Sequence, residues 1–467
     1  MIKRTLTALI LAVSVVFSFS VSAFAASGAI AQNPAYSTVT EVEDWGACFT
    51  KIIVNLGGGR TVTKGSVSKD TFKVHLVKYQ EDGKTQLQIH DPSDITWQNP
   101  NKMIPLEGGD RIITDAYVSD SSGNPVSSSN FVTLELKISQ DDNLSTALYA
   151  KEAYAAAWNV PAFTITQQKD MNSNVGIISG LKITNSKGGV RKLVDEFKTG
   201  RYTNSEDNVT LTFADYVPKE DNNKNPLIIW LHGLGEGGTD PTATISGNKA
   251  CNFASEKIQK YFGGAYVLAP QAPTYWMEGI NGGAIGSSSG FGDGTSRYEK
   301  ALMGLIKDYV SKHNDIDTNR IYIGGDSNGG YMTMLMIRDY GDYFAAAMPT
   351  CEALKDTLIT DKQIEGMKNI PIWFTAAKTD TLVPVDQYIN PTYDRLIKAG
   401  AKNAHKSLFD KVVDTTGLYK NKDGTPYEYF GHSSWIYVYN NECTSEINGK
   451  SKTIMEWLAD QTLKNRS

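Results

Sequence analysis

A serine between two pairs of glycines is the first residue in this sequence that could do covalent chemistry. Ser327 lies in Gly325–Gly329, which has the pattern G-x-S-x-G of a nucleophile held on a sharp turn between a strand and a helix. The apolar run RIYIGG precedes Ser327 and the amphipathic run GGYMTMLMIRDY follows it, so both flanking elements are predicted. Gly286–Gly290 repeats the pattern around Ser288, but loop residues flank it on both sides. We therefore predict Ser327 as the nucleophile.

A serine hydroxyl needs a general base to take its proton, and two histidines follow Ser327 in the chain. His432 lies in YFGHSSW, which we predict as a loop after the last strand, where an imidazole can reach across the top of the sheet. His405 lies in AKNAHKSLF, where a strand is predicted to begin. An exposed histidine at a strand end is the ordinary interpretation of His405, so His432 is the predicted base.

The base in turn needs a carboxylate that holds its tautomer, and the order Ser, Asp, His places this residue between Ser327 and His432, just after a strand. Asp380 directly follows the apolar run IPIWFTAAKT and begins the turn DTLVP. Asp386 is the alternative. It lies at the predicted start of the next helix, where a carboxylate commonly caps the first turn.

The tetrahedral intermediate of acyl transfer also needs N–H donors for its oxyanion. The turn HGLG ends the apolar run NPLIIWL and predicts the backbone N–H of Leu234 as one donor. The N–H of Asn328, directly after the nucleophile, is the predicted second donor. His232 lies outside the order of the triad, and we predict a structural hydrogen-bonding role for it.

Two domains are predicted to position these residues. Residues 33–168 read as short strands between turn clusters, which suggests a small immunoglobulin-like β-sandwich. In FVTLELKI, from Phe131, Val132, Leu134, Leu136 and Ile138 fall on one face and Thr133, Glu135 and Lys137 on the other. Within residues 175–467, continuous apolar runs alternate with helical patterns, which indicates a mostly parallel sheet flanked by helices on both faces.

Residues 1–25 read as a secretory signal peptide. Lys3 and Arg4 precede the apolar run 6–21, and the segment AFA at 23–25 offers a cleavage site. An N-terminal membrane anchor is the alternative, but the apolar run is short for it, and no later run approaches the roughly 18 residues of a span. The net charge of −5 gives nucleic acid no electrostatic reason to bind. We expect a secreted protein, extracellular or periplasmic, with neither a membrane nor a nucleic acid as partner.

The cysteines show no metal-ligand spacing, and we expect neither a metal nor another cofactor. The four are Cys48, Cys251, Cys351 and Cys443. Export would permit one disulfide among the last three, while buried free thiols are the alternative.

Five motifs in order resemble the α/β-hydrolase superfamily. More narrowly, they are similar to secreted bacterial esterases often labelled predicted peptidases, which are related to polyhydroxybutyrate depolymerases and feruloyl esterases. The motifs are HGLGEGG, GGAYVLAPQAPTYWM, DIDTNRIYIGGDSNGGYMT, DTLVP and GHSSWIYVYNNE, within roughly residues 190–465. The family's roles fall on Ser327, Asp380, His432 and the backbone of Leu234 and Asn328. The stretch 413–431 before His432 is longer than in small esterases. Some members carry an N-terminal immunoglobulin-like domain, which can mediate homo-oligomerisation.

The resemblance and the predicted triad together imply a secreted serine carboxylester hydrolase that works through an acyl enzyme. Its substrate would be a small or polymeric ester, with short-chain, acetyl, feruloyl and polyester types all open. We expect Trp276 and Trp435 to line the substrate pocket, with core packing as the alternative for each. A serine peptidase of the prolyl-oligopeptidase-like type would use the same triad. The alternative from another class is a catalytically inert binding or adhesion protein.

Overall fold

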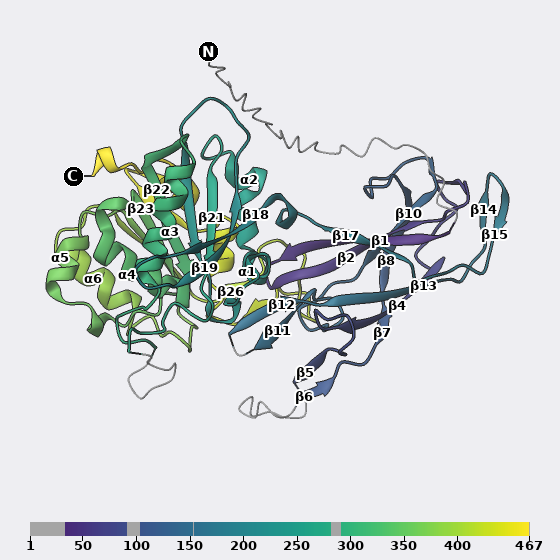
Figure 1. Cartoon of the computed structure of the whole chain (residues 1–467), viewed down its shortest axis with the longest axis horizontal. Coiled ribbons are helices and arrows are strands. Elements are labelled where there is room, and N and C mark those ends of the chain that lie inside the picture. Colours follow the sequence, from purple (N-terminus) through teal and green to yellow (C-terminus); the bar gives the residue numbers. More distant parts are fainter. Residues whose placement is uncertain (1–32, 91–102, 153, 282–290, 467) are drawn as a thin grey trace, which may run out of the picture.

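The computed structural model describes residues 33–90, 103–152, 154–281 and 291–466. The predicted signal peptide and Ser288 lie outside these residues. Figure 1 shows a β-rich N-terminal body, purple to blue, beside a larger body of strands and helices, teal to yellow.

The N-terminal body is built from two main sheets that share one apolar core. The first sheet has the strand order β17-β1-β2-β10-β8, with β17 (Ser186–Arg191), β1 (Ala35–Glu43), β2 (Gly46–Asn55), β10 (Phe131–Leu136) and β8 (Ile113–Ser119). The second has the order β16-β13-β4-β7, with β16 (Lys182–Ile183), β13 (Val160–Gln167), β4 (Phe72–Tyr79) and β7 (Gly109–Arg111). Side chains of both sheets meet in the same core cluster, as expected for a sandwich.

Smaller strands complete this body. A further sheet has the order β15-β14-β3-β9, with β15 (Gly176–Ile178), β14 (Met171–Ser173), β3 (Val62–Thr63) and β9 (Ser128–Ser129). Two strand pairs project from the sandwich: β5 (Gln88–His90) with β6 (Met103–Pro105), and β11 (Leu148–Glu152) with β12 (Ala155–Trp158).

The alternation in β10 holds on its apolar face and fails at one polar position. Val132, Leu134 and Leu136 are buried as predicted, whereas Ile138 lies beyond the end of the strand. Thr133, predicted on the other face, is also fully buried. Its hydroxyl donates a 2.8 Å hydrogen bond to Ser119 Oγ on the neighbouring strand, which satisfies the polar group inside the domain.

The strands of the N-terminal sheets continue past the boundary of 168–175 that the sequence predicts. β16 pairs with β13, and β17 pairs in parallel with β1. Backbone pairing therefore joins residues 171–191 to the N-terminal body, and we propose that the boundary between the domains lies directly after Arg191.

The C-terminal body is organised around one eight-stranded sheet. Its order is β18-β19-β21-β20-β22-β23-β24-β25, and all neighbours from β21 to β25 are parallel. The strands are β18 (Lys198–Thr203), β19 (Thr210–Tyr216), β21 (Tyr266–Gln271), β20 (Asn225–Leu231), β22 (Ile316–Asp326), β23 (Ala346–Thr350), β24 (Ile372–Ala377) and β25 (Ala404–Phe409). All seven residues of β20 are buried, which agrees with the continuous apolar pattern.

Helices cover both faces of this sheet. α3 (Glu299–Lys312) and α4 (Asn328–Tyr340) contribute to one core cluster, while α7 (Trp435–Tyr439) and α8 (Ile454–Ala459) contribute to a second. The other helices are α1 (Pro241–Gly247), α2 (Glu256–Gln259), α5 (Asp361–Met367) and α6 (Ile389–Lys398). Two strand pairs lie near the C-terminus: β26 (Val412–Val413) with β27 (Glu428–Tyr429), and β28 (Thr444–Ile447) with β29 (Lys450–Thr453).

The four cysteines are free and buried, so the alternative of buried thiols is confirmed over a disulfide. In the part of the chain that the structure describes, no helix is long and apolar enough to cross a membrane.

Candidate active site

Ser327 lies on a strained turn between β22 and α4. Its backbone has φ 55° and ψ −112°, a conformation that costs a non-glycine residue about 1–3 kcal/mol. The flanking glycines allow this turn because a Cβ at Gly325 would lie 2.6 Å from Gly329 C, and one at Gly329 would lie 1.8 Å from Leu231 O. Only glycine fits at these two positions, so the G-x-S-x-G pattern here has a steric reason.

One chain of hydrogen bonds joins the three predicted triad residues. His432 Nε2 lies 2.8 Å from Ser327 Oγ, and His432 Nδ1 lies 2.7 Å from Asp380 Oδ2. The other carboxylate oxygen of Asp380 accepts the backbone N–H groups of Leu382 (2.9 Å) and Val383 (2.8 Å). Because a carboxylate can only accept, it holds the proton of His432 on Nδ1 and leaves Nε2 free to accept from the serine hydroxyl.

The loops that carry Asp380 and His432 lie against each other. Asp380 is the third residue after the end of β24, and His432 is the third residue after the end of β27. Gly431 permits the contact, since a Cβ there would lie 2.3 Å from Thr379 O. His432 is 5 % exposed and Asp380 3 % exposed, so bulk water is largely kept from the bond between them.

The rival residues lie elsewhere. His405 is on β25, where its Nε2 lies 2.9 Å from Asn403 Oδ1 and its ring contacts Trp373 and Trp457. Asp386 is exposed and accepts a 2.8 Å hydrogen bond from Asn390. Neither residue hydrogen-bonds to Ser327 or His432 among the described residues.

The two predicted oxyanion donors begin two helices beside Ser327. Leu234 starts the short 3-10 helix η2 (Leu234–Glu236), and Asn328 starts α4. The Asn328 side chain joins the two segments, because its Nδ2 donates to His232 O (3.2 Å) and its Oδ1 accepts from Met277 N (3.0 Å).

His232 supports this arrangement as a structural residue, as predicted. Its Nδ1 lies 2.7 Å from Gly233 O, and its Nε2 accepts the Ala272 N–H at 3.1 Å. This pattern requires a neutral imidazole with its proton on Nδ1. Burial lowers the pKa of His232 to about 4, which keeps the ring neutral at physiological pH.

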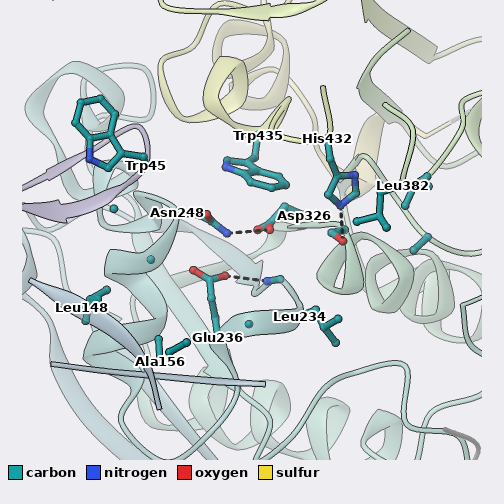
Figure 2. Close-up of a pocket in the computed structure, with 18 of the residues that line it drawn as sticks. Trp45, Leu148, Ala156, Leu234, Glu236, Asn248, Asp326, Leu382, His432 and Trp435 are labelled. Carbon is teal, nitrogen blue, oxygen red and sulfur yellow. Dashed lines mark hydrogen bonds between the residues drawn. The ribbon is translucent and has the colours of Figure 1, made fainter. Parts of the chain in front are cut away.

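A cavity of about 450 Å³ opens beside Ser327 and His432, and both domains line it. The N-terminal domain contributes Trp45, Gly46, Ala47, Thr146, Leu148, Tyr149, Ala150 and Ala156. Figure 2 shows Trp45, Leu148 and Ala156 on the side opposite His432 and Leu382. The sequence carried no local signal for this wall, because none of its residues belongs to a catalytic motif.

Contacts between the domains hold the wall in place. Lys249 forms a 2.7 Å ion pair with Asp44, and Trp158 Nε1 donates to Thr242 Oγ1 at 2.8 Å. The long stretch 413–431 also reaches the N-terminal domain: Tyr419 donates to Glu43 at 2.7 Å, and its ring contacts Trp45.

Of the two tryptophans predicted to line the pocket, the structure places one there. Trp435 lines the cavity, and its ring lies edge-on to His432 with the centroids 5.5 Å apart. The predicted position of Trp276 in the pocket is corrected: its side chain is fully buried in the core, against His232 and Tyr298. It is the next residue, Met277, that reaches the cavity.

Two buried carboxyl groups that the sequence reasoning missed also line the cavity, Glu236 and Asp326. Burial raises the pKa of Asp326 to about 6. Burial, and then the charge of Asp326, raise the pKa of Glu236 well above its usual value. Both residues lie inside segments that the sequence singles out, Glu236 in HGLGEGG and Asp326 in GDSNG, and this position was the available signal.

No group of three or more His, Cys, Asp or Glu side chains is placed to hold a metal ion in the described ranges.

Two family models match separate parts of the chain. Residues 35–180 match the esterase Ig-like N-terminal domain, and residues 303–394 match the prolyl oligopeptidase family. The second match spans β22, Ser327 and α4 and ends before His432.

Individual proteins also resemble the chain. Feruloyl esterase B of Neurospora crassa is 30 % identical over 131 residues, which are 28 % of this chain and 40 % of the relative. The chain thus matches two fifths of that relative's length. The crystal structure of a thermostable esterase aligns with a TM-score of 0.69 at 23 % identity, covering 92 % of this chain and 99 % of that one. These likenesses confirm the predicted fold class of both domains.

Proposed function

We propose that this chain, an α/β-hydrolase domain preceded by an immunoglobulin-like domain of the esterase type, is a secreted serine carboxylester hydrolase. One observation carries the proposal: the continuous hydrogen-bond chain Ser327–His432–Asp380 at a strained turn beside a cavity. This is the arrangement that activates a serine for acyl transfer.

In the proposed reaction, Ser327 Oγ attacks the ester carbonyl while His432 Nε2 takes its proton. The Leu234 and Asn328 N–H groups stabilise the oxyanion of the tetrahedral intermediate. His432 then returns the proton to the leaving alcohol, which gives the acyl enzyme. Water attacks the acyl group by the same steps, with His432 again as base, and Ser327 is released.

The cavity supports a small or slender acyl group over a charged one. Most of its described lining is apolar, and its ionisable residues are Tyr149, Glu236, Asp326 and the base His432. The relative from Neurospora crassa is a feruloyl esterase by name. Feruloyl esters are therefore a substrate class to test beside acetyl, butyryl and polyester substrates. We further propose export through the signal peptide at residues 1–25, and the N-terminal domain remains the proposed surface for any homo-oligomer.

A serine peptidase is the second candidate, because residues 303–394 match the prolyl oligopeptidase family. Hydrolysis of p-nitrophenyl acyl esters should be compared with hydrolysis of peptide anilides. Turnover of anilides alone would overturn the ester assignment.

The nucleophile can be tested independently of the substrate. A fluorophosphonate probe should label the wild type and S288A equally and should not label S327A. Full labelling of S327A would refute the proposed site, and absence of labelling in the folded wild type would favour an inert binding protein.

A further inference from the structure

Glu236 and Asp326 lie beside the nucleophile as a pair of buried carboxyl groups. Glu236 ends η2 and is 6 % exposed, while Asp326 precedes Ser327 and is 1 % exposed. A Cβ at Gly233 would lie 2.7 Å from Asp326 Oδ2 and 3.4 Å from Glu236 Oε2, so both groups border the same small space. Asn248 Nδ2 donates a 3.4 Å hydrogen bond to Asp326 (Figure 2), and Asn248 also interacts with Glu236.

Hydrogen bonding indicates which of the two carries the negative charge. Asp326 accepts from Trp230 Nε1 (3.1 Å), Tyr439 Oη (3.3 Å) and Asn248 Nδ2 (3.4 Å). Glu236 Oε2 accepts the Gly233 N–H (2.9 Å) and Glu236 also interacts with Asn248, but its Oε1 has no hydrogen-bond partner among the described residues. Several donors favour the ionised form of a carboxyl group, and two buried negative charges in close proximity disfavour each other. The proton therefore belongs on Glu236.

Among the residues that the structure describes, no cation compensates a charge on Glu236. Asp326 on β22 and Tyr439 on α7 are the titratable groups that interact with it, and the charge of Asp326 raises its pKa. His432 interacts with Asp326, whose pKa it lowers. Lys249, next to Asn248 in the chain, is paired with Asp44.

We propose that Glu236 is a positioning residue that works as a neutral carboxylic acid and holds the turn that presents the Leu234 N–H to the oxyanion. It anchors Gly233 through its side chain, and its backbone carbonyl accepts from Thr244 Oγ1 (2.7 Å) and Gln271 Nε2 (3.1 Å). An ionised Glu236 would oppose the negative charge that develops on the substrate. This role rests on the proposed acyl transfer.

The neutral state has a direct spectroscopic test. At pH 8, the infrared difference between wild type and E236Q should contain the C=O band of a protonated carboxylic acid, shifted in D2O. This measurement needs no substrate, so it stands even if the proposed reaction fails. Absence of the band would overturn the proposal.

Kinetics test the positioning role. With p-nitrophenyl acetate, E236Q keeps a neutral acceptor for Gly233 and should retain kcat within about threefold. E236A removes that acceptor and should lower kcat about 100-fold, as expected for a misplaced oxyanion donor, with KM changed less than about threefold. The positioning role would be overturned if kcat of E236Q fell as far as that of E236A, or if kcat of E236A matched that of the wild type. If E236A does not fold, kcat of E236Q and the infrared band of the protonated carboxyl group test the proposal.

Glu352 provides the matched control. It is fully buried, its Oε1 also lacks a partner within the described ranges, and its Oε2 accepts the Leu354 N–H at 2.7 Å. It does not belong to the described lining of the cavity. E352Q should keep kcat within about twofold, and a loss equal to that of E236A would show a general effect of altering buried carboxyl groups and overturn the specific role.

Discussion

Replacing Asp380 by asparagine should inactivate the protein while leaving its fold in place. The Asp380 oxygen that accepts from Leu382 and Val383 (2.9 and 2.8 Å) can be replaced by the amide oxygen of asparagine. The amide NH2 must then face His432 Nδ1, where a carboxylate oxygen lies at 2.7 Å. Because NH2 can only donate, Nδ1 must become the acceptor, and the proton moves to Nε2, which faces Ser327.

The wrong tautomer cannot accept the serine proton. A change of this kind lowers kcat about 10⁴-fold in a serine protease with the same triad, which corresponds to about 5 kcal/mol of activation free energy. We expect a loss of this size for D380N in p-nitrophenyl acetate hydrolysis, with a thermal unfolding midpoint close to that of the wild type.

D386N is the matched control, since Asp386 is exposed and bonds only to Asn390 among the described residues. It should retain kcat within about twofold, as surface substitutions usually do. A D380N variant with more than a tenth of the wild-type kcat would refute the tautomer argument.

The remaining predictions concern stability and the wall of the cavity. The unfolded chain protonates His232 near the ordinary histidine pKa of about 6.5, whereas in the folded protein burial lowers that pKa to about 4. The free energy of unfolding therefore falls as the pH falls through this window. In urea unfolding, the decrease between about pH 7 and 4 should be about 3 kcal/mol smaller for H232Q than for the wild type. In the same assay, G329A should lower the free energy of unfolding by more than about 3 kcal/mol, because its Cβ would lie 1.8 Å from Leu231 O. G366A in α5, where an added Cβ would have nothing within 4 Å, should raise the free energy of unfolding by up to about 1 kcal/mol. A156F should lower kcat/KM for p-nitrophenyl octanoate more than for the acetate, and an unchanged ratio would show that the N-terminal wall does not contact the acyl chain.

The sequence predicted the parts of the site that depend on local geometry. Ser327, Asp380 and His432 each lie in a short segment whose flanking strand, turn or helix can be read from neighbouring residues. The order of these segments along a parallel sheet predicts that they meet at one edge, and the structure brings them within hydrogen-bonding distance.

Features that depend on contacts between distant segments could not be predicted. Trp276 and Trp435 both lie near motifs, and only the packing of His232 and Tyr298 shows that Trp276 is buried in the core. The part of the cavity lining that the N-terminal domain supplies depends on how the two domains dock. This docking leaves no periodic pattern in the sequence of either domain. Thr133 hydrogen-bonds to Ser119 on another strand, which the alternation within its own strand cannot reveal. The alternation therefore placed Thr133 on the face opposite the core, although its side chain is buried.

The docking of the two domains also constrains how the N-terminal domain can evolve. Gly46 has φ +115°, and a Cβ there would lie 2.9 Å from Gly247 O in the hydrolase domain, beside the cavity that both glycines line. In an isolated sandwich, the residue at the start of this central strand would be constrained only by its own backbone conformation. Here a larger side chain would separate the domains and open the cavity at once. Under the proposed function, the space offered to a substrate therefore depends on residues far from any catalytic motif, and a change on one side of this contact must be matched on the other.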